Sequence, residues 1–509
     1  MASTGRKLAA WLLAAAALCA LAYAGVRITE RRIESVVREG LSSFAQGKGM
    51  VMDVKDIRYA LWNNRLAVNG LAFRNADQNG LNLSVREAEL EGINRMMALR
   101  MAWGGMESLP DGVQPVASRA VVRNLHAWPS PDCTLQERAV EGLAIDMSQM
   151  KKLLDKAAAS ARTSEKVVQM ALASVTYSQA GSKGLRLRQE FAPGQEVIFE
   201  MDEAVERGVS SGHMDECLIQ GIRCLRPDGQ EALSIKKTLL RQLNLSAQVQ
   251  QWIYGDDNAE PSPLAVIKEL FGGERSFLEL CEVEGVTLAA GMEPVTLGLF
   301  RWKNPQTRPF ACGLVLEKLH MPLGLTPELG SLSLLGYSQV DLDIALSGQF
   351  QPMGSSQPSE LRMDVTGLNM GTVSLASQCV LDDVFSRGLQ PQEMLGEGIR
   401  VKSLSLAYTE GGLVAKIAGL GRRLLGVKPE SLVEMFSEFM WKALPDSEKT
   451  PAKEKLLSQI KLFLNKPGKI SVSLVPPAPV PLGKLDSVLE KHSQVEIQEG
   501  SRTLQELSL

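Results

Sequence analysis

The chain has 509 residues, a length that predicts roughly two to four folding units rather than one. Hydrophobic residues make up 45% and charged residues 22%, which is the composition of a globular protein and excludes overall disorder. The formal net charge of -3, from 55 basic and 58 acidic residues, provides no bulk attraction for nucleic acid or for anionic lipid, so we predict no nucleic-acid partner.

The first element along the chain is an uncharged run from Leu8 to Val26, preceded by Arg6 and Lys7. At ~1.5 Å rise per residue, a helix of this length can cross a ~30 Å hydrocarbon layer. The positive charges before it favour a cytoplasmic N-terminus and export of the remaining chain. We therefore predict a single-pass membrane anchor. Its residues are Leu8, Trp11, Leu12, Leu13, Leu18, Leu21, Tyr23 and Val26.

A cleaved signal peptide is the alternative interpretation of this segment. Ala22, Tyr23 and Ala24 precede Gly25 and form an A-x-A cleavage pattern. We favour the anchor because the apolar region of a signal peptide spans only ~7 to 15 residues, and this run is longer.

The pattern of residues 27–45 predicts an amphipathic stalk helix that leaves the membrane. Apolar side chains recur there at helical spacing between charged ones. They are Ile33, Val36, Val37, Leu41 and Phe44. Packing of this apolar stripe on the body of the same protein is an equally good interpretation.

Period-two alternation in short runs dominates the exported part and predicts half-buried antiparallel strands. The clearest series is at residues 340–350, 361–366 and 373–375, with a turn-rich connection at 352–358. Such a sheet has one apolar and one polar face. A second sheet, flanking helices or a bound lipid must cover the apolar face.

Helical periodicity predicts helices at 148–160 and 263–271, and two amphipathic helices near 432–440 and 456–464. A strand follows at 470–474. The Pro-rich run 475–481 is expected to end strand pairing, since proline lacks a backbone N–H, and the tail beyond residue 494 is expected to fray.

We therefore predict an α+β protein: an N-terminal transmembrane helix, then antiparallel β-rich modules, as a curved sheet or a sandwich, with interspersed and C-terminal amphipathic helices. Polar, turn-rich stretches near residues 255 and 388 divide the body. The predicted segments are 1–26 (membrane anchor), 27–45 (amphipathic stalk helix), 46–255 (β-rich periplasmic module with helical insertions), 256–388 (antiparallel β-meander module) and 389–509 (C-terminal helical region with a returning strand and a Pro-rich end).

Candidate chemical groups are sparse. The 4 histidines, His126, His213, His320 and His492, are widely separated. His213, Asp215, Glu216 and Cys217 form one local cluster, which cannot close a tetrahedral metal site, so we interpret it as a solvated turn. Asp341 and Asp343 are two residues apart, so their side chains lie on the same face of a strand, which we interpret as its solvent-exposed face. Cys217 and Cys224 could face each other across a hairpin, although most cysteines fit small buried positions.

Gly419, Gly421 and Gly426 do not form the G-x-G-x-x-G pattern of nucleotide-binding loops, and we interpret them as a helix end. The sequence contains no G-x-S-x-G, H-E-x-x-H or C-x-x-C motif. We therefore predict that the protein is not an enzyme and has no catalytic residue, no cofactor and no metal.

Two segments after the predicted anchor, residues 55–73 and 83–90, resemble the opening module of AsmA-like bacterial envelope proteins. Residues 334–346 and 471–482 are similar to segments of proteobacterial periplasmic proteins of comparable size. The resemblance covers about a third of the chain. It implies an inner-membrane protein with a curved, β-rich periplasmic body, in a group linked to outer-membrane lipid homeostasis. In the longest members it implies lipid passage along an apolar groove, but this chain is short and interrupted by helices.

The leading hypothesis is a non-enzymatic envelope protein, anchored in the bacterial inner membrane with the bulk of the chain in the periplasm, that handles lipid or serves envelope homeostasis. Its partners are then the membrane, lipid and other envelope proteins. The alternative is an envelope scaffold with a closed β core and no lipid ligand. The two hypotheses differ in whether the apolar sheet face is open or filled.

Overall fold

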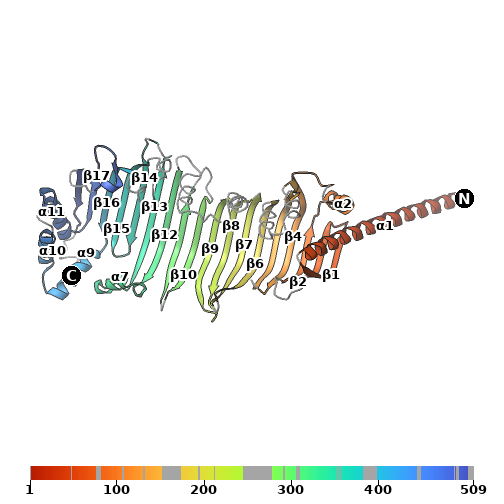
Figure 1. Ribbon diagram of the computed structural model, residues 1–509, viewed down its shortest axis with the longest axis horizontal. Helices are drawn as coiled ribbons and strands as arrows, with labels where there is room; N and C mark the ends of the chain where they lie inside the picture. The colour runs from red at the N-terminus through yellow and green to blue at the C-terminus, as the bar shows by residue number, and fades with distance from the viewer. Residues whose placement is uncertain are drawn as a thin grey trace. The chain divides into compact units, whose positions relative to one another are not determined.

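The computed structural model describes residues 2–47, 49–75, 82–105, 108–129, 132–148, 150–151, 174–192, 195–210, 212–244, 278–290, 293–304, 310–351, 355, 357–381, 398–443, 449–485, 488 and 492–501. Within these ranges it does not describe the side chains of residues 2–22, 47, 191, 192, 195, 290, 310, 328, 381 and 452. The chain is mostly β. Nineteen strands in these ranges belong to a single antiparallel sheet. Figure 1 shows the strands of this sheet.

The predicted α+β class thus overestimates the share of helix in the chain. The sandwich alternative is wrong for the described strands, because they belong to a single sheet. The chain divides into two compact units. Unit 1 comprises residues 1–232 and 241–257, and unit 2 comprises residues 233–240 and 258–509. The predicted boundaries near 255 and 388 and the predicted helix at 263–271 lie outside the described residues, as does most of the predicted helix at 148–160.

In unit 1, the first eight strands pair consecutively in chain order. The helices are α1 (Ala2–Gly47) and α2 (Arg95–Gly104). The strands are β1 (Met50–Ala60), β2 (Arg65–Asn75), β3 (Asn82–Glu91), β4 (Val113–Trp128), β5 (Asp132–Asp146), β6 (Val175–Ala192), β7 (Gln195–Ser210) and β8 (His213–Leu225). Strand β9 (Glu231–Asn244) contributes residues to both units.

The side-chain alternation of these strands shifts by one residue along a row that crosses the sheet. In β1 and β2, for example, Val54 lies opposite Leu71 and Ile57 lies opposite Val68 on the same face, with Gly70 between them at a φ of 60°. Glycine adopts this left-handed conformation without strain, and asparagine adopts it more readily than most other residues. We call this row the seam. It crosses unit 1 through Lys55, Gly70, Arg86, Asn124, Gln136, Gly184, Asp202 and Gly221.

In unit 2, the strands are β10 (Leu280–Ala290), β11 (Glu293–Lys303), β12 (Phe310–Pro322), β13 (Gln339–Phe350), β14 (Ser359–Gly367), β15 (Gly371–Leu381), β16 (Ile399–Glu410), β17 (Lys469–Leu474), β18 (Val480–Pro481) and β19 (Ser493–Gln498). Of these, β10 to β17 again form a meander, whereas β18 pairs with β16 and β19 pairs with β17. Strands β13 to β15 confirm the predicted series at 340–375.

The helices of unit 2 include the two predicted amphipathic helices, α10 (Pro429–Ala443) and α11 (Pro451–Asn465). They follow α9 (Leu413–Leu425), which ends at Gly426 with a φ of 67°, as predicted for that glycine. Gly419 and Gly421 lie inside α9, so their assignment to the helix end is wrong. Short helical turns follow β12 at η2 (Leu323–Leu325), α7 (Pro327–Gly330) and η3 (Ser331–Leu335), and η6 (Leu482–Lys484) follows β18.

Two expectations for the C-terminal end are wrong. The Pro-rich run does not simply end strand pairing, because Val480 and Pro481 pair with Val401 and Arg400 of β16. Residues 494–498 do not fray, because β19 pairs with β17 along its whole length, and residues 502–509 lie outside the described ones. A proline can occupy such a position where its missing N–H is not needed for the ladder.

Candidate functional site

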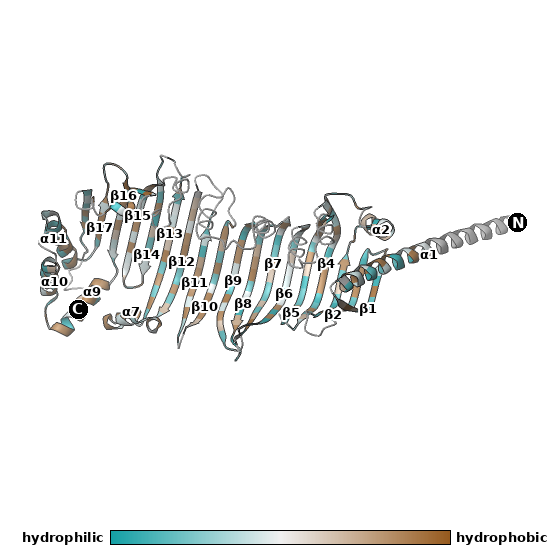
Figure 2. Cartoon of the chain, in the orientation of Figure 1, coloured by the Kyte–Doolittle hydropathy of each residue, from teal (hydrophilic) through white to brown (hydrophobic). Residues whose placement is uncertain are grey.

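One face of unit 1 is lined by apolar side chains from strand to strand. The register places Leu71, Val85 and Leu125 side by side, and the row continues through Leu135, Leu185, Met201 and Ile222. A parallel row runs through Phe73, Leu83, Ala127, Cys133, Leu187, Phe199 and Cys224. Figure 2 shows the corresponding alternation of hydrophobic and hydrophilic residues along the strands. We call this surface the apolar face of unit 1.

On the opposite face of unit 1, a row of side chains with alternating charge crosses the strands, and we call this row the charged ladder. Arg123 lies between Glu87 and Glu137, with N–O distances of 2.9 and 3.0 Å. Lys183 and Glu203 continue the row on β6 and β7, 3.8 Å apart. Opposite charges on neighbouring strands stabilise a solvated sheet surface. The two faces of this sheet therefore have opposite character.

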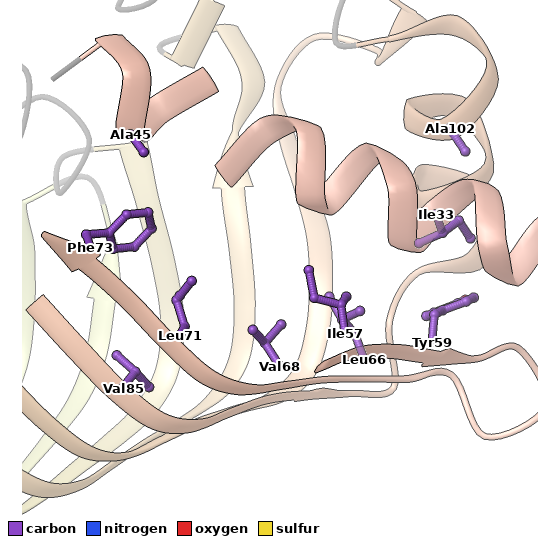
Figure 3. Packing of buried hydrophobic residues seen from close by; sticks show 10 residues of the cluster. All are labelled: Ile33, Ala45, Ile57, Tyr59, Leu66, Val68, Leu71, Phe73, Val85 and Ala102. Atoms are coloured by element: carbon purple, nitrogen blue, oxygen red, sulfur yellow. The ribbon is translucent and has the colours of Figure 1, made fainter. Parts of the chain in front are cut away.

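Helix α1 covers the beginning of the apolar face (Figure 3). Ile33 is buried against the first strands, and Val37 and Leu41 pack beside it. Two carboxylates of α1 also accept hydrogen bonds from the edge of β1: Glu34 from the Tyr59 backbone N–H and Glu30 from the Leu61 N–H, both at 2.9 Å. The apolar stripe of residues 27–45 thus packs on the body of the protein, which is the second interpretation given by the sequence.

A cavity of about 390 Å³ lies between α1, α2 and the sheet. Its volume falls within the range of ligand pockets, roughly 300 to 1,000 Å³. Helix α1 contributes Ile33, Val36 and Val37. The other lining residues are Tyr59, Leu66, Leu90, Ile93, Met97, Ala98, Met101, Ala102, Val116, Ile145, Met147 and Met150. Every lining side chain is apolar except for the Tyr59 hydroxyl.

A polar cluster interrupts the apolar face of unit 1 farther along the sheet. Arg138 of β5 donates hydrogen bonds to Glu206 of β7 at 3.0 and 3.2 Å and to Ser182 of β6 at 2.9 Å. The Tyr177 hydroxyl donates to the same Glu206 carboxylate. Burial and the Glu206 hydrogen bond raise the pKa of Tyr177, so its hydroxyl remains a donor at neutral pH.

Unit 2 has an apolar face of the same kind. One row runs through Val283, Phe300, Leu316, Ile344, Val365, Val373, Tyr408, Ile470 and Ile497. A second row includes Leu375, Leu406 and Val472. Leu406 is 47% exposed and Val373 is 38% exposed. Phe463 of α11 packs on Tyr408 at one end of this surface, with ring centroids 6.0 Å apart. At Val373 and Leu406 no second layer of described residues closes the surface, which we call the apolar face of unit 2.

The helices α9 and α10 carry a separate group of exposed apolar side chains. Leu424 is 72% exposed and Phe439 is 67% exposed. Ile417, Leu425, Met435, Phe436 and Met440 are also exposed. Contiguous exposed apolar groups of this size are typical of interaction surfaces.

The predicted anchor lies mostly outside the described side chains. This applies to Leu8, Trp11, Leu12, Leu13, Leu18 and Leu21, whereas Tyr23 is exposed and Val26 is partly exposed on α1. Among the described residues, none of the helices combines the length and the apolar character needed to cross a bilayer.

The residues singled out for possible chemistry are dispersed. His213, Asp215 and Cys217 lie within β8 and not in a turn, and no group of metal-ligating side chains occurs in the described ranges. Asp341 is hydrogen-bonded by Gln339 and by His320, and both lower the pKa of its carboxyl. Asp343 accepts a hydrogen bond from the Lys318 backbone N–H at 2.7 Å.

The six described cysteines are free thiols. Cys217 and Cys224 lie on the same strand, β8, so they cannot face each other across a hairpin. The sequence did not indicate the Tyr59 cavity or the Arg138 cluster. In the sequence, each site is marked only by a polar side chain on a strand. Whether that side chain faces the apolar side of the sheet depends on where the seam shifts the alternation.

A family model described as "Uncharacterized protein" matches residues 360–497. The match extends from β14 to β19 and includes α9, α10 and α11. It covers well under half of the chain and includes the similar segment at 471–482. It carries no AsmA assignment. No curated protein matches the chain.

Proposed function

We propose that this chain is a non-enzymatic, membrane-anchored envelope protein whose β-rich body handles lipid. An AsmA-like relationship and a location in a bacterial inner membrane, with the bulk of the chain in the periplasm, belong to the same proposal. The uncharged run at residues 8–26 and the resemblance of residues 55–73 and 83–90 support this location.

The single observation that carries the proposal is the open apolar face of unit 2. Leu406 and Val373 lie in register with apolar neighbours on both sides and are still 47% and 38% exposed. Burying one such side chain contributes about 1.5–3 kcal/mol, so a row of them favours an apolar occupant. A lipid acyl chain is apolar along its length and requires no hydrogen-bond partner from the sheet.

A second candidate function is an envelope scaffold, and the exposed apolar side chains of α9 and α10 favour it. Phe436 and Phe439 are aromatic residues of the type that anchors protein interfaces. In this alternative, α9 and α10 bind another envelope protein, and the sheet carries no lipid.

Site-specific photo-crosslinking in the full chain, expressed in a Gram-negative host, distinguishes the two functions. A photoreactive amino acid at position 406 is expected to form lipid adducts. The matched control is position 409 on the same strand, because Thr409 points to the opposite face. Protein adducts without lipid adducts at 406 would support the scaffold. Equal lipid labelling at 406 and 409 would argue against a specific apolar track.

A further inference from the structure

The cavity under α1 contains a buried hydroxyl without a partner. Tyr59 is 3% exposed, and its hydroxyl has no hydrogen-bond partner among the described residues. Nearly all buried polar groups in proteins are hydrogen-bonded, so an orphaned hydroxyl at a ligand-sized cavity indicates a missing acceptor or donor. The remaining lining of the cavity is apolar.

The surroundings of Tyr59 determine which kind of partner fits. Burial raises the pKa of Tyr59 above its ordinary value, so the hydroxyl keeps its proton and can donate at neutral pH. The charges of Arg95 and Glu30 act on the Tyr59 hydroxyl in opposite directions, and that of Arg95 acts more strongly. The described lining of the cavity contains no charged side chain, so burying an unpaired carboxylate there would be costly. The partner is therefore a neutral acceptor rather than a fatty-acid anion.

We propose that this cavity binds one acyl chain of an ester-linked lipid and that Tyr59 donates a hydrogen bond to the ester carbonyl oxygen. The inference rests on the proposed lipid-handling function and specifies a ligand for one place in it. The acyl chain occupies the space between Ile33, Leu66 and Met97, and the carbonyl satisfies the single orphaned donor.

Ester and ether lipids provide the test. The full chain is reconstituted in phosphatidylcholine vesicles that contain a tracer with a diazirine on its acyl chain, linked either by an ester or by an ether. An ether-linked tracer lacks the carbonyl. Crosslinking is quantified on the tryptic peptide 96–100 of α2, which contains Met97. The ester tracer is expected to label this peptide about fivefold more, which corresponds to one neutral hydrogen bond.

Tyr59→Phe is expected to lower this ester-to-ether ratio to about one while leaving the ether labelling unchanged. Tyr337→Phe is the matched control, because Tyr337 is also buried, at 8% exposed in unit 2, and donates to the Asn369 carbonyl at 2.6 Å, away from the cavity. It should leave the ratio at the wild-type value. The substitution at 59 removes one atom, so circular dichroism should show an intact fold.

A wild-type ratio of one, or a ratio that Tyr59→Phe does not change, would overturn the inference. The wild-type measurement decides this even if the variant does not fold. Lipid adducts at position 406 together with unlabelled 96–100 would refute the cavity ligand and leave the proposed function standing. Absence of lipid adducts at both places would refute both.

Discussion

Arg138 and Glu206 form a two-bond ion pair across the apolar face of unit 1, with N–O distances of 3.0 and 3.2 Å. Their strands, β5 and β7, are separated by β6, so the pair spans a strand whose Ser182 is buried beneath it. Replacing only one partner leaves the other charge without its counterpart in an apolar environment.

We expect Glu206→Gln to lower the free energy of unfolding by about 1–3 kcal/mol, below the value for a fully buried pair because the Arg138 side chain is 36% exposed. The double replacement Arg138→Leu with Glu206→Met restores apolar character and should recover most of this loss. Urea denaturation followed by tryptophan fluorescence measures both changes. Additive losses in the double variant would contradict the ion-pair interpretation.

Removal of the Tyr59 hydroxyl should stabilise the lipid-free protein. An unsatisfied buried hydroxyl costs about 1–3 kcal/mol, so Tyr59→Phe is expected to raise the midpoint of unfolding. Tyr408→Phe is the comparison, because the Tyr408 hydroxyl lies 2.6 Å from two acceptors, the Met370 carbonyl and the Glu410 carboxylate, and can donate to either. That substitution should lower the midpoint. A decrease in both variants would indicate that Tyr59 already has a partner.

The seam predicts that alanine substitution has different effects on stability at two glycines of β6. Gly184 has a φ of 60° and its missing Cβ faces the Gln136 side chain, so Gly184→Ala should destabilise unit 1 by about 1–2 kcal/mol. Gly181 has an ordinary φ, and the nearest atom to an added Cβ is the Ala204 carbonyl oxygen at 4.0 Å. Gly181→Ala should therefore be nearly neutral. Thermal unfolding of the two variants measures the difference.

Cys217 should react slowly with thiol reagents in the folded protein. It is buried, and this burial raises its pKa to about 11. At pH 8 only about a thousandth of the thiol is then ionised, and the reactive thiolate increases about tenfold per pH unit up to the pKa. Maleimide labelling read by peptide mass spectrometry should modify the less buried Cys133 before Cys217. Denaturation should abolish this order.

Short hairpins were predictable from the sequence, whereas long strands were not. Strands β13 to β15 are 12, 9 and 11 residues long, and their alternation continues from one to the next. In β6, with 18 residues, the inward side chains are Leu187 and Leu185 on one side of Gly184 and Ser182 and Ala180 on the other. A strict period of two would place Ser182 on the outside.

The same shift explains why the candidate site was not found from the sequence. Arg138 reaches the apolar face because the alternation of β5 shifts at Gln136. The cavity also requires α1 and α2 to meet over the sheet, through contacts such as the Arg32 side chain with the Ala102 carbonyl, 3.2 Å apart and 70 residues apart in the chain. Local periodicity contains no information on such contacts.

The straight course of the seam has an evolutionary consequence. Four of its eight residues have a positive φ, and they occur on every second strand: Gly70, Asn124, Gly184 and Gly221. The β-hairpin, with one left-handed residue in the seam, is therefore the repeating unit of unit 1. Duplicating or deleting one hairpin would preserve both the hydrophobic rows and the charged ladder, so descendants of a common ancestor can differ greatly in strand number while keeping the same cross-section.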